Sequence, residues 1–186
     1  MYEYEYKTLH DMLEQGEKNK ISLSEVAVRH EMETSGQSEQ AVRKLMEGRL
    51  DVFHESIQAG LADNGKSVSG LVGGDAHKLL EGTPKLLGPL ARKAAIYALA
   101  VSEANAKMFK IVACPTAGSC GIVPAVMTAA AEELGTAKDV SVNALFTAAG
   151  IGAVVSRNAC VAGAVGGCQA ECGTAAGMAA AAVAEM

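Results

Sequence analysis

Cysteine lies next to glycine at two places in the chain, in the stretches GSCGIVPAVM and GGCQAECG. A thiol beside glycine can lie where a ligand approaches the backbone closely, because glycine has no side chain in the way. Both residues are also small enough to suit crowded packing, and a free cysteine is often simply a small buried apolar residue. The rest of the sequence has to separate these two interpretations.

The first stretch, CPTAGSCG, lies directly before an apolar segment that predicts a helix over residues 122–134. Hydroxyls and bare backbone amides would gather at the N-terminus of that helix, where the helix dipole favours a carboxylate or a phosphate. The candidate ligand-binding residues are Thr116, Gly118, Ser119 and Gly121. A tight turn between two helices is the alternative interpretation.

The second stretch, NACVAGAVGGCQAECG, follows a predicted helix and carries three of the five cysteines. Cys168 and Cys172 are four residues apart, so on a helix they could share a face and bind one metal ion. The absence of a Cys-x-x-Cys pair and of a nearby histidine argues against zinc. An iron–sulfur site is chemically allowed, but the cysteines of this chain lack a ferredoxin-like spacing.

The composition predicts one all-α domain, residues 1–186, with glycine- and serine-rich active-site loops. Hydrophobic residues make up 49% of the chain, yet it has only 3 Phe and no Trp, so small and aliphatic side chains must build a helical core. A net charge of -5 without a long basic run argues against nucleic acid as a partner. The acidic N-terminus and the odd cysteine count favour a reducing compartment, the cytoplasm.

Helix signals recur along the chain. Ser22 and Glu25 form a possible capping box, Ser38 can cap a helix that Gly60 would stop, and Pro89 can begin another.

Further helices are predicted over residues 142–156 and from residue 174 onward. At the end of the chain, GTAAGMAAAAVAEM breaks off in mid-helix and predicts a truncated C-terminus. Residues 62–88 are rich in turn-forming residues and predict a long loop or broken segment, and a loop of this length is usually either mobile or functional. The uncharged stretch 111–131 contains prolines and glycines and predicts a buried loop and core helix rather than a membrane span.

The stretches CPTAGSCGIVPAVM and NACVAGAVGGCQAECGTAAGMAAAAVAEM closely resemble the alpha chain of the iron–sulfur L-serine dehydratases, or L-serine ammonia-lyases. ISLSEVAVRHEME and SGLVGGDAHKL agree as well, so the resemblance covers essentially the whole chain. It implies an oxygen-sensitive [4Fe-4S] cluster held by three cysteines, with one iron open to substrate. Cys168 of GGCQAE matches one ligand, and the other two lie in segments beyond this chain. Cys120, Cys160 and Cys172 match no family ligand.

The resemblance implies conversion of L-serine to pyruvate and ammonia, with the open iron acting as a Lewis acid on the hydroxyl. The two glycine-rich stretches are then expected at one site. Thr116 and Ser119 would hold the substrate carboxylate, and Asn158 would add a hydrogen bond beside the cluster. The loop SGLVGGDAHK offers a further binding residue, Ser69.

The general base has three weak candidates in the same loop, Asp75, His77 and Lys78. A serine- and histidine-rich loop of a beta chain is the alternative source, and it implies a partner chain and a possible higher oligomer. His10, His30 and His54 lie in charged helical segments and are expected to be solvated.

Three other functions stay open at this point. A related lyase that removes sulfide from L-cysteine could use the same cluster, because iron also binds thiolate well. An inactive fragment or scaffold is the non-enzymatic alternative. A pyridoxal-phosphate enzyme is disfavoured because the small-residue loops contain no lysine for a Schiff base, apart from Lys78 in the central loop.

Overall fold

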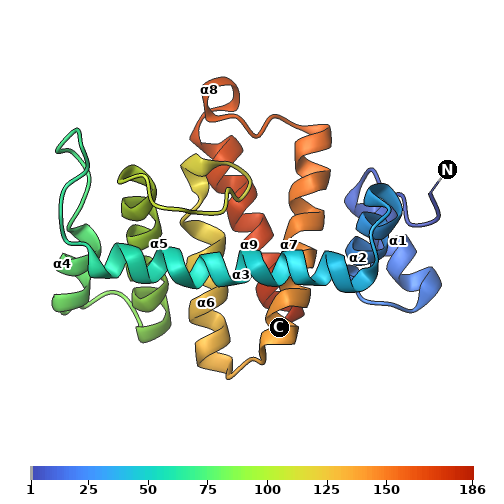
Figure 1. Ribbon diagram of the computed structural model, residues 1–186, viewed down its shortest axis with the longest axis horizontal. Helices are drawn as coiled ribbons and strands as arrows, with labels where there is room; N and C mark the ends of the chain where they lie inside the picture. The colour runs from blue at the N-terminus through green and yellow to red at the C-terminus, as the bar shows by residue number, and fades with distance from the viewer. Residues whose placement is uncertain (1) are drawn as a thin grey trace.

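The computed structural model describes residues 2–186, and these form helices and loops with no β-strand among them, which confirms the all-α prediction. The helices are α1 Leu9–Asn19, α2 Leu23–Ser35, α3 Glu39–Ala62, α4 Asp75–Glu81, α5 Pro89–Ala106, α6 Ile122–Leu134, α7 Lys138–Asn158, α8 Gly163–Gly166 and α9 Thr174–Glu185. Two short turns, η1 Ala117–Ser119 and η2 Gln169–Gly173, precede α6 and α9. Figure 1 shows α3 along the long axis, with α1 and α2 at one end, α4 and α5 at the other, and α6, α7 and α9 crossing it.

Local capping signals place several helix starts where the sequence predicts them. The Ser38 hydroxyl accepts a hydrogen bond from the Ala41 amide at 3.3 Å, and the Ser22 hydroxyl accepts one from the Glu25 amide at 3.2 Å. Pro89 is the first residue of α5, and α6 has the predicted bounds. Because each cap joins residues a few positions apart, the sequence alone contains the signal.

Several boundaries differ from the prediction. α3 runs through Gly60 to Ala62. α7 begins at Lys138 instead of residue 142 and ends at Asn158 instead of residue 156, so Asn158 is its last residue rather than a residue of the following loop. The predicted central loop contains α4, whose first amides donate to the buried carboxylate of Glu103 on α5. Sequence reasoning missed this helix because its N-terminal partner lies on another helix.

Gly60 serves close packing and does not end the helix. A Cβ atom at this position would lie 2.0 Å from the carbonyl oxygen of Ala100 on α5. The backbones of α3 and α5 therefore approach each other closely at Gly60, and only glycine leaves room for that contact.

Two clusters of buried apolar side chains form the core. The larger cluster includes Phe53, Met127 and Leu145 and joins α2, α3, α6, α7 and α9. The smaller cluster contains Ile57, Val101 and Cys120, from α3, α5 and the turn before α6. α3 contributes to both clusters, so the two ends of the molecule share one helix.

One helix among residues 2–186, α7, is long and apolar enough to cross a membrane by length and composition. Of its most apolar window, 56% is buried inside the protein, as is common for a core helix. The uncharged stretch 111–131 forms a loop, η1 and most of α6, which confirms the predicted loop and core helix. The loop is only partly buried, because Ala113, Ala117 and Gly118 are exposed.

Replacing Gly60 with alanine is expected to lower the free energy of unfolding by at least about 2 kcal/mol, because the new methyl group has no space against Ala100. Gly48 is the matched control: it lies exposed in the same helix, and a Cβ there meets nothing within 4 Å. Gly48→Ala should instead raise stability by about 0.5–1 kcal/mol. Urea unfolding followed by circular dichroism measures both changes, and equal effects would contradict the close contact.

Candidate active site

The two glycine-rich stretches form adjacent loops, as expected. One loop, residues 114–121, leads through η1 into α6, and the other, residues 159–173, leads through α8 and η2 into α9. η1 and η2 are in contact. A side-chain hydrogen bond joins the loops, in which the Thr116 hydroxyl donates to Oε1 of Glu171 at 3.0 Å.

The carboxylate of Glu171 lies between a glycine of each loop. A Cβ on Gly118 would lie 2.5 Å from Oε2 of Glu171, and a Cβ on Gly163 would lie 2.8 Å from the same oxygen. Any larger residue at either position would displace the carboxylate. Thr116, Gly118 and Gly163 thus form a carboxylate cradle, which in this structure holds the carboxylate of Glu171. That the cradle binds a substrate carboxylate stays a prediction.

Glu171 is the site residue that the sequence analysis missed. It lies within GGCQAECG, but nothing in its neighbours along the chain indicates that it reaches Thr116, 55 residues away. Spacing patterns report contacts along one helix or strand, and this contact joins two loops.

The Ser119 hydroxyl is used in a hydrogen bond within the first loop, and Gly121 is used in the packing of this loop against α5. The buried Ser119 hydroxyl donates to the Cys114 carbonyl at 2.9 Å, so it stabilises the loop. A Cβ on Gly121 would lie 2.6 Å from the Ala98 carbonyl oxygen, so this glycine lets the start of α6 lie against α5. Thr116 and Gly118 are the predicted residues of this loop that line the carboxylate cradle.

The second loop exposes two cysteines and brings two sulfurs together. Cys168 and Cys160 are exposed and Cys172 is half-buried. The Sγ atoms of Cys168 and Cys172 are 3.6 Å apart, whereas the Cys160 sulfur lies 3.7 Å from the Ala162 carbonyl. Residues 2–186 contain no group of three or more potential metal ligands. The described part of the chain therefore does not by itself fit a cluster that needs three thiolates.

The two buried cysteines are packing residues. Burial raises the pKa of the Cys114 thiol to about 12 and that of the Cys120 thiol to about 11. Both thiols are therefore protonated near neutral pH and behave as small apolar groups. Of the two interpretations of cysteine beside glycine, close packing applies to Cys120, while Cys168 is exposed at the loop surface.

Asn158 lies at the junction of α7 and the second loop. Its side-chain nitrogen donates to the Lys7 carbonyl at 2.6 Å and to the Val154 carbonyl at 2.9 Å. These bonds attach the N-terminal segment to the end of α7. The predicted hydrogen bond from Asn158 to a ligand beside Cys168 would have to use the amide oxygen.

The candidates of the central loop lie on or beside α4, with α5 between α4 and α6 (Figure 1). Asp75 and Lys78 form an ion pair at 2.8 Å, which lowers the pKa of Asp75 and raises the pKa of Lys78. Both shifts make a poorer base at neutral pH, because the carboxylate is less basic and the amine stays protonated.

The other two candidates of the central loop are His77 and Ser69. Nε2 of His77 is buried without a hydrogen-bond partner, and the Ser69 hydroxyl lies 3.1 Å from that of Ser67. No hydrogen bond or ion pair within residues 2–186 joins these four candidates to the two glycine-rich loops.

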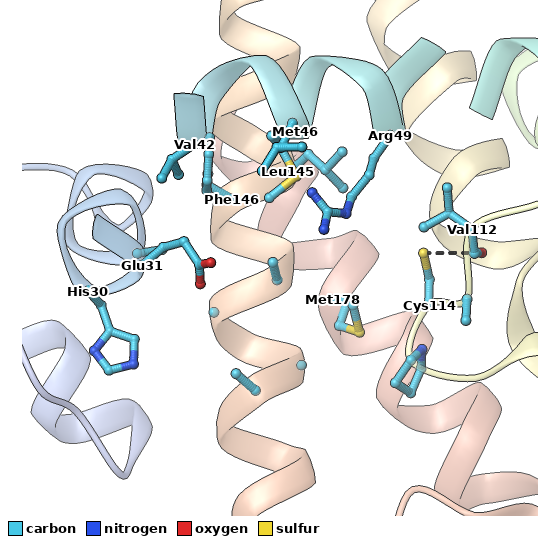
Figure 2. Close-up of a pocket in the computed structure, with 18 of the residues that line it drawn as sticks. His30, Glu31, Val42, Met46, Arg49, Val112, Cys114, Leu145, Phe146 and Met178 are labelled. Carbon is cyan, nitrogen blue, oxygen red and sulfur yellow. Dashed lines mark hydrogen bonds between the residues drawn. The ribbon is translucent and has the colours of Figure 1, made fainter. Parts of the chain in front are cut away.

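A separate groove of about 430 Å³ opens beside the first loop. Its walls are mainly apolar and come from α2, α3, α7, Met178 of α9 and residues 112–115 (Figure 2). Arg49 and Glu31 project into it, and within residues 2–186 neither side chain forms an ion pair.

His30 also lines the groove, which corrects the expectation that it is solvated. This histidine is half-buried, with its Nδ1 atom 3.1 Å from the Tyr4 carbonyl oxygen. Its ring centroid lies 4.7 Å from that of Tyr6. His30 thus helps attach the N-terminal segment to α2.

Comparison with known proteins gives consistent relatives. Residues 18–186 match the family model described as serine dehydratase alpha chain. The probable L-serine dehydratase alpha chain of Bacillus subtilis is 40% identical over 184 residues, which cover 97% of this chain and 61% of that protein. The L-serine dehydratase alpha chain of Peptoniphilus asaccharolyticus is 38% identical over 169 residues, or 89% of this chain and 58% of that protein. The chain thus spans about three fifths of the length of these two relatives.

The contact between Gly118 and Glu171 predicts energetic coupling. Gly118→Ala should destabilise the wild-type protein, because the new methyl group pushes the carboxylate out of its position. The same substitution should cost less in a Glu171→Ala background, where nothing has to move. Unfolding free energies of the four proteins in this double-mutant cycle are expected to give a coupling of about 1 kcal/mol. Additive effects would show that the carboxylate does not lie between the loops.

Thiol reactivity should follow the pKa shifts. The thiolate is the reactive form, and a raised pKa keeps a thiol protonated until the pH approaches that value. Iodoacetamide at about pH 8 should therefore leave Cys114 and Cys120 unmodified in the folded protein, and it should label Cys160, which is exposed. Peptide mass spectrometry measures the labelling, with the unfolded protein as control, in which all five cysteines should react. Labelling of Cys114 as fast as Cys160 would contradict its burial.

Proposed function

The chain belongs to the serine dehydratase alpha chain family, and from this premise we propose that its protein converts L-serine to pyruvate and ammonia. The match over residues 18–186 supports the reaction class. The observation that carries the proposal for a site is the meeting of the two glycine-rich loops around one carboxylate. A carboxylate is the group that every amino-acid substrate must present.

Thr116 and Gly118 are proposed to bind the substrate carboxylate in the cradle that Glu171 occupies. Two carboxylates at such close range repel each other strongly, so both cannot use the Thr116 hydroxyl at once. Substrate binding would then move the Glu171 side chain, which is the flexible member of the contact. Binding of L-serine would exchange one carboxylate for another while the loops keep their backbone positions. Ser119 and Gly121 would support this cradle from within the first loop.

Cys168 is proposed as the single ligand that this chain offers to a [4Fe-4S] cluster. It is exposed and lies three residues before Glu171, on the same loop. Since residues 2–186 gather no set of three ligands, the remaining thiolates would come from outside these residues. The proposal places the cluster beside the carboxylate cradle, where Asn158 would also lie.

A beta chain is proposed as the partner and as the source of the general base. Asp75 and Lys78 form an ion pair that makes each of them a poorer base, which favours a base from the partner. Large apolar side chains are exposed on the loops that flank α4 and on α8, and a partner chain would cover them: Val68, Leu71, Leu86 and Val165. The assembled enzyme is expected in the cytoplasm, and a higher oligomer is compatible with these surfaces.

The test uses the complete enzyme with its partner chain, prepared without oxygen. Cys168→Ala is expected to abolish pyruvate formation from L-serine and to lower the iron content per alpha chain. Cys160→Ala is the matched control, because Cys160 is an exposed thiol of the same loop. That control should keep both the iron and the activity.

Equal iron loss in both variants would contradict the assignment of Cys168 as a ligand. Faster release of pyruvate from L-cysteine than from L-serine by the wild-type enzyme would contradict the assignment of the substrate. Each result bears on one part of the proposal, so the two assignments are tested separately.

A further inference from the structure

We propose that Cys168 and Cys172 are a site of reversible oxidation, at which a small disulfide such as oxidised glutathione converts the two thiols into an intrachain disulfide. The proposal follows from the position of their sulfurs, which lie 3.6 Å apart on the exposed second loop. A disulfide bond needs about 2.05 Å, so the sulfurs must approach by about 1.5 Å. Rotation about the side-chain bonds, together with a small backbone adjustment, supplies movements of this size.

The backbone around the pair permits that adjustment. Cys168 directly precedes the wide turn η2, and Cys172 lies within that turn, next to its last residue, Gly173. Gly166 and Gly167 precede Cys168, and Gly167 has a φ of 73°, which favours glycine. The closing movement therefore stays within a surface loop, outside both core clusters.

The other three cysteines do not share this arrangement. Cys160 is exposed, and its sulfur faces a backbone carbonyl. Cys114 and Cys120 are buried, so a dissolved disulfide cannot reach them. The chain thus contains one close pair of accessible sulfurs and, on the same loop, an accessible single thiol for comparison.

The reaction proceeds by two exchange steps. The thiolate of Cys168, the more exposed of the pair, attacks one sulfur of the small disulfide and releases one molecule of its thiol. A mixed disulfide forms at Cys168. The Cys172 thiol then loses its proton and attacks the Cys168 sulfur, which closes the protein disulfide and releases the second small thiol. The two protein thiols lose two electrons, and the small disulfide gains them.

The consequence for metal binding rests on the proposed function. A sulfur within a disulfide cannot bind iron as a thiolate, so the oxidised pair and a cluster bound at Cys168 exclude each other. Oxidation of the metal-free protein would then be stored as a disulfide, which thiols reduce. The alternative is sulfinic or sulfonic acid at Cys168, which is essentially irreversible.

The experiment treats the metal-free, folded protein with oxidised glutathione, blocks the remaining thiols with iodoacetamide and maps the peptides by mass spectrometry. The expected product carries a Cys168–Cys172 disulfide, with a mass loss of about 2 Da, and a glutathione adduct at Cys160. In Cys172→Ser, the glutathione adduct should instead accumulate at Cys168. Dithiothreitol should restore both thiols in the wild-type protein.

A glutathione adduct that accumulates at Cys168 in the wild-type protein as it does at Cys160 would overturn the proposal, as would an unreacted pair. Because these outcomes are measured on the wild-type protein, they test the proposal even if Cys172→Ser fails to fold. Loading the complete enzyme with iron and sulfide first tests the link to function, since a cluster ligand should be protected from exchange. A disulfide that forms equally fast with and without the cluster would leave the oxidation site intact and overturn the ligand assignment.

Discussion

Direct backbone contact on α5 is the constraint from which the arrangement of the site follows. Gly60 of α3 packs directly against the Ala100 carbonyl, and Gly121 at the start of α6 packs directly against the Ala98 carbonyl. With no side chain between them, the separation of these helices cannot vary without loss of contact. The start of α6 is thereby fixed, and with it the loop that carries Thr116 and Gly118. The position of the carboxylate cradle is thus a result of how three helices pack.

The site combines a rigid part and an adjustable part. The first loop is held by the buried Ser119 hydroxyl and by the packing of Gly121, so its backbone has little freedom. The second loop is exposed and rich in glycine, and it reaches the first through the side chain of Glu171. Under the proposed function, binding and release of a substrate carboxylate would change the position of one side chain and leave the α6 end in place.

Sequence reasoning succeeded where the deciding partner is close along the chain. The Ser38 hydroxyl caps the amide of Ala41, and the spacing of apolar residues within α6 is enough to predict that helix. It failed where the partner is distant: α4 depends on Glu103, 27 to 29 residues further on, and Glu171 depends on Thr116. Gly60 shows the same limit, because a glycine in a helix can end it or accommodate a neighbour, and only the neighbour decides. The family resemblance predicted that the two loops lie together, a question that composition and spacing alone left open.

The continuity of α3 has a consequence for how the molecule unfolds. This helix has 24 residues, about 36 Å in length, and its side chains belong to both core clusters. Neither cluster can come apart without exposing apolar surface of a helix that the other still holds. The two ends of the protein should therefore melt in one cooperative transition. Amide hydrogens in the middle of α3 should exchange with solvent only through global unfolding, while those of the exposed second loop should exchange through local opening.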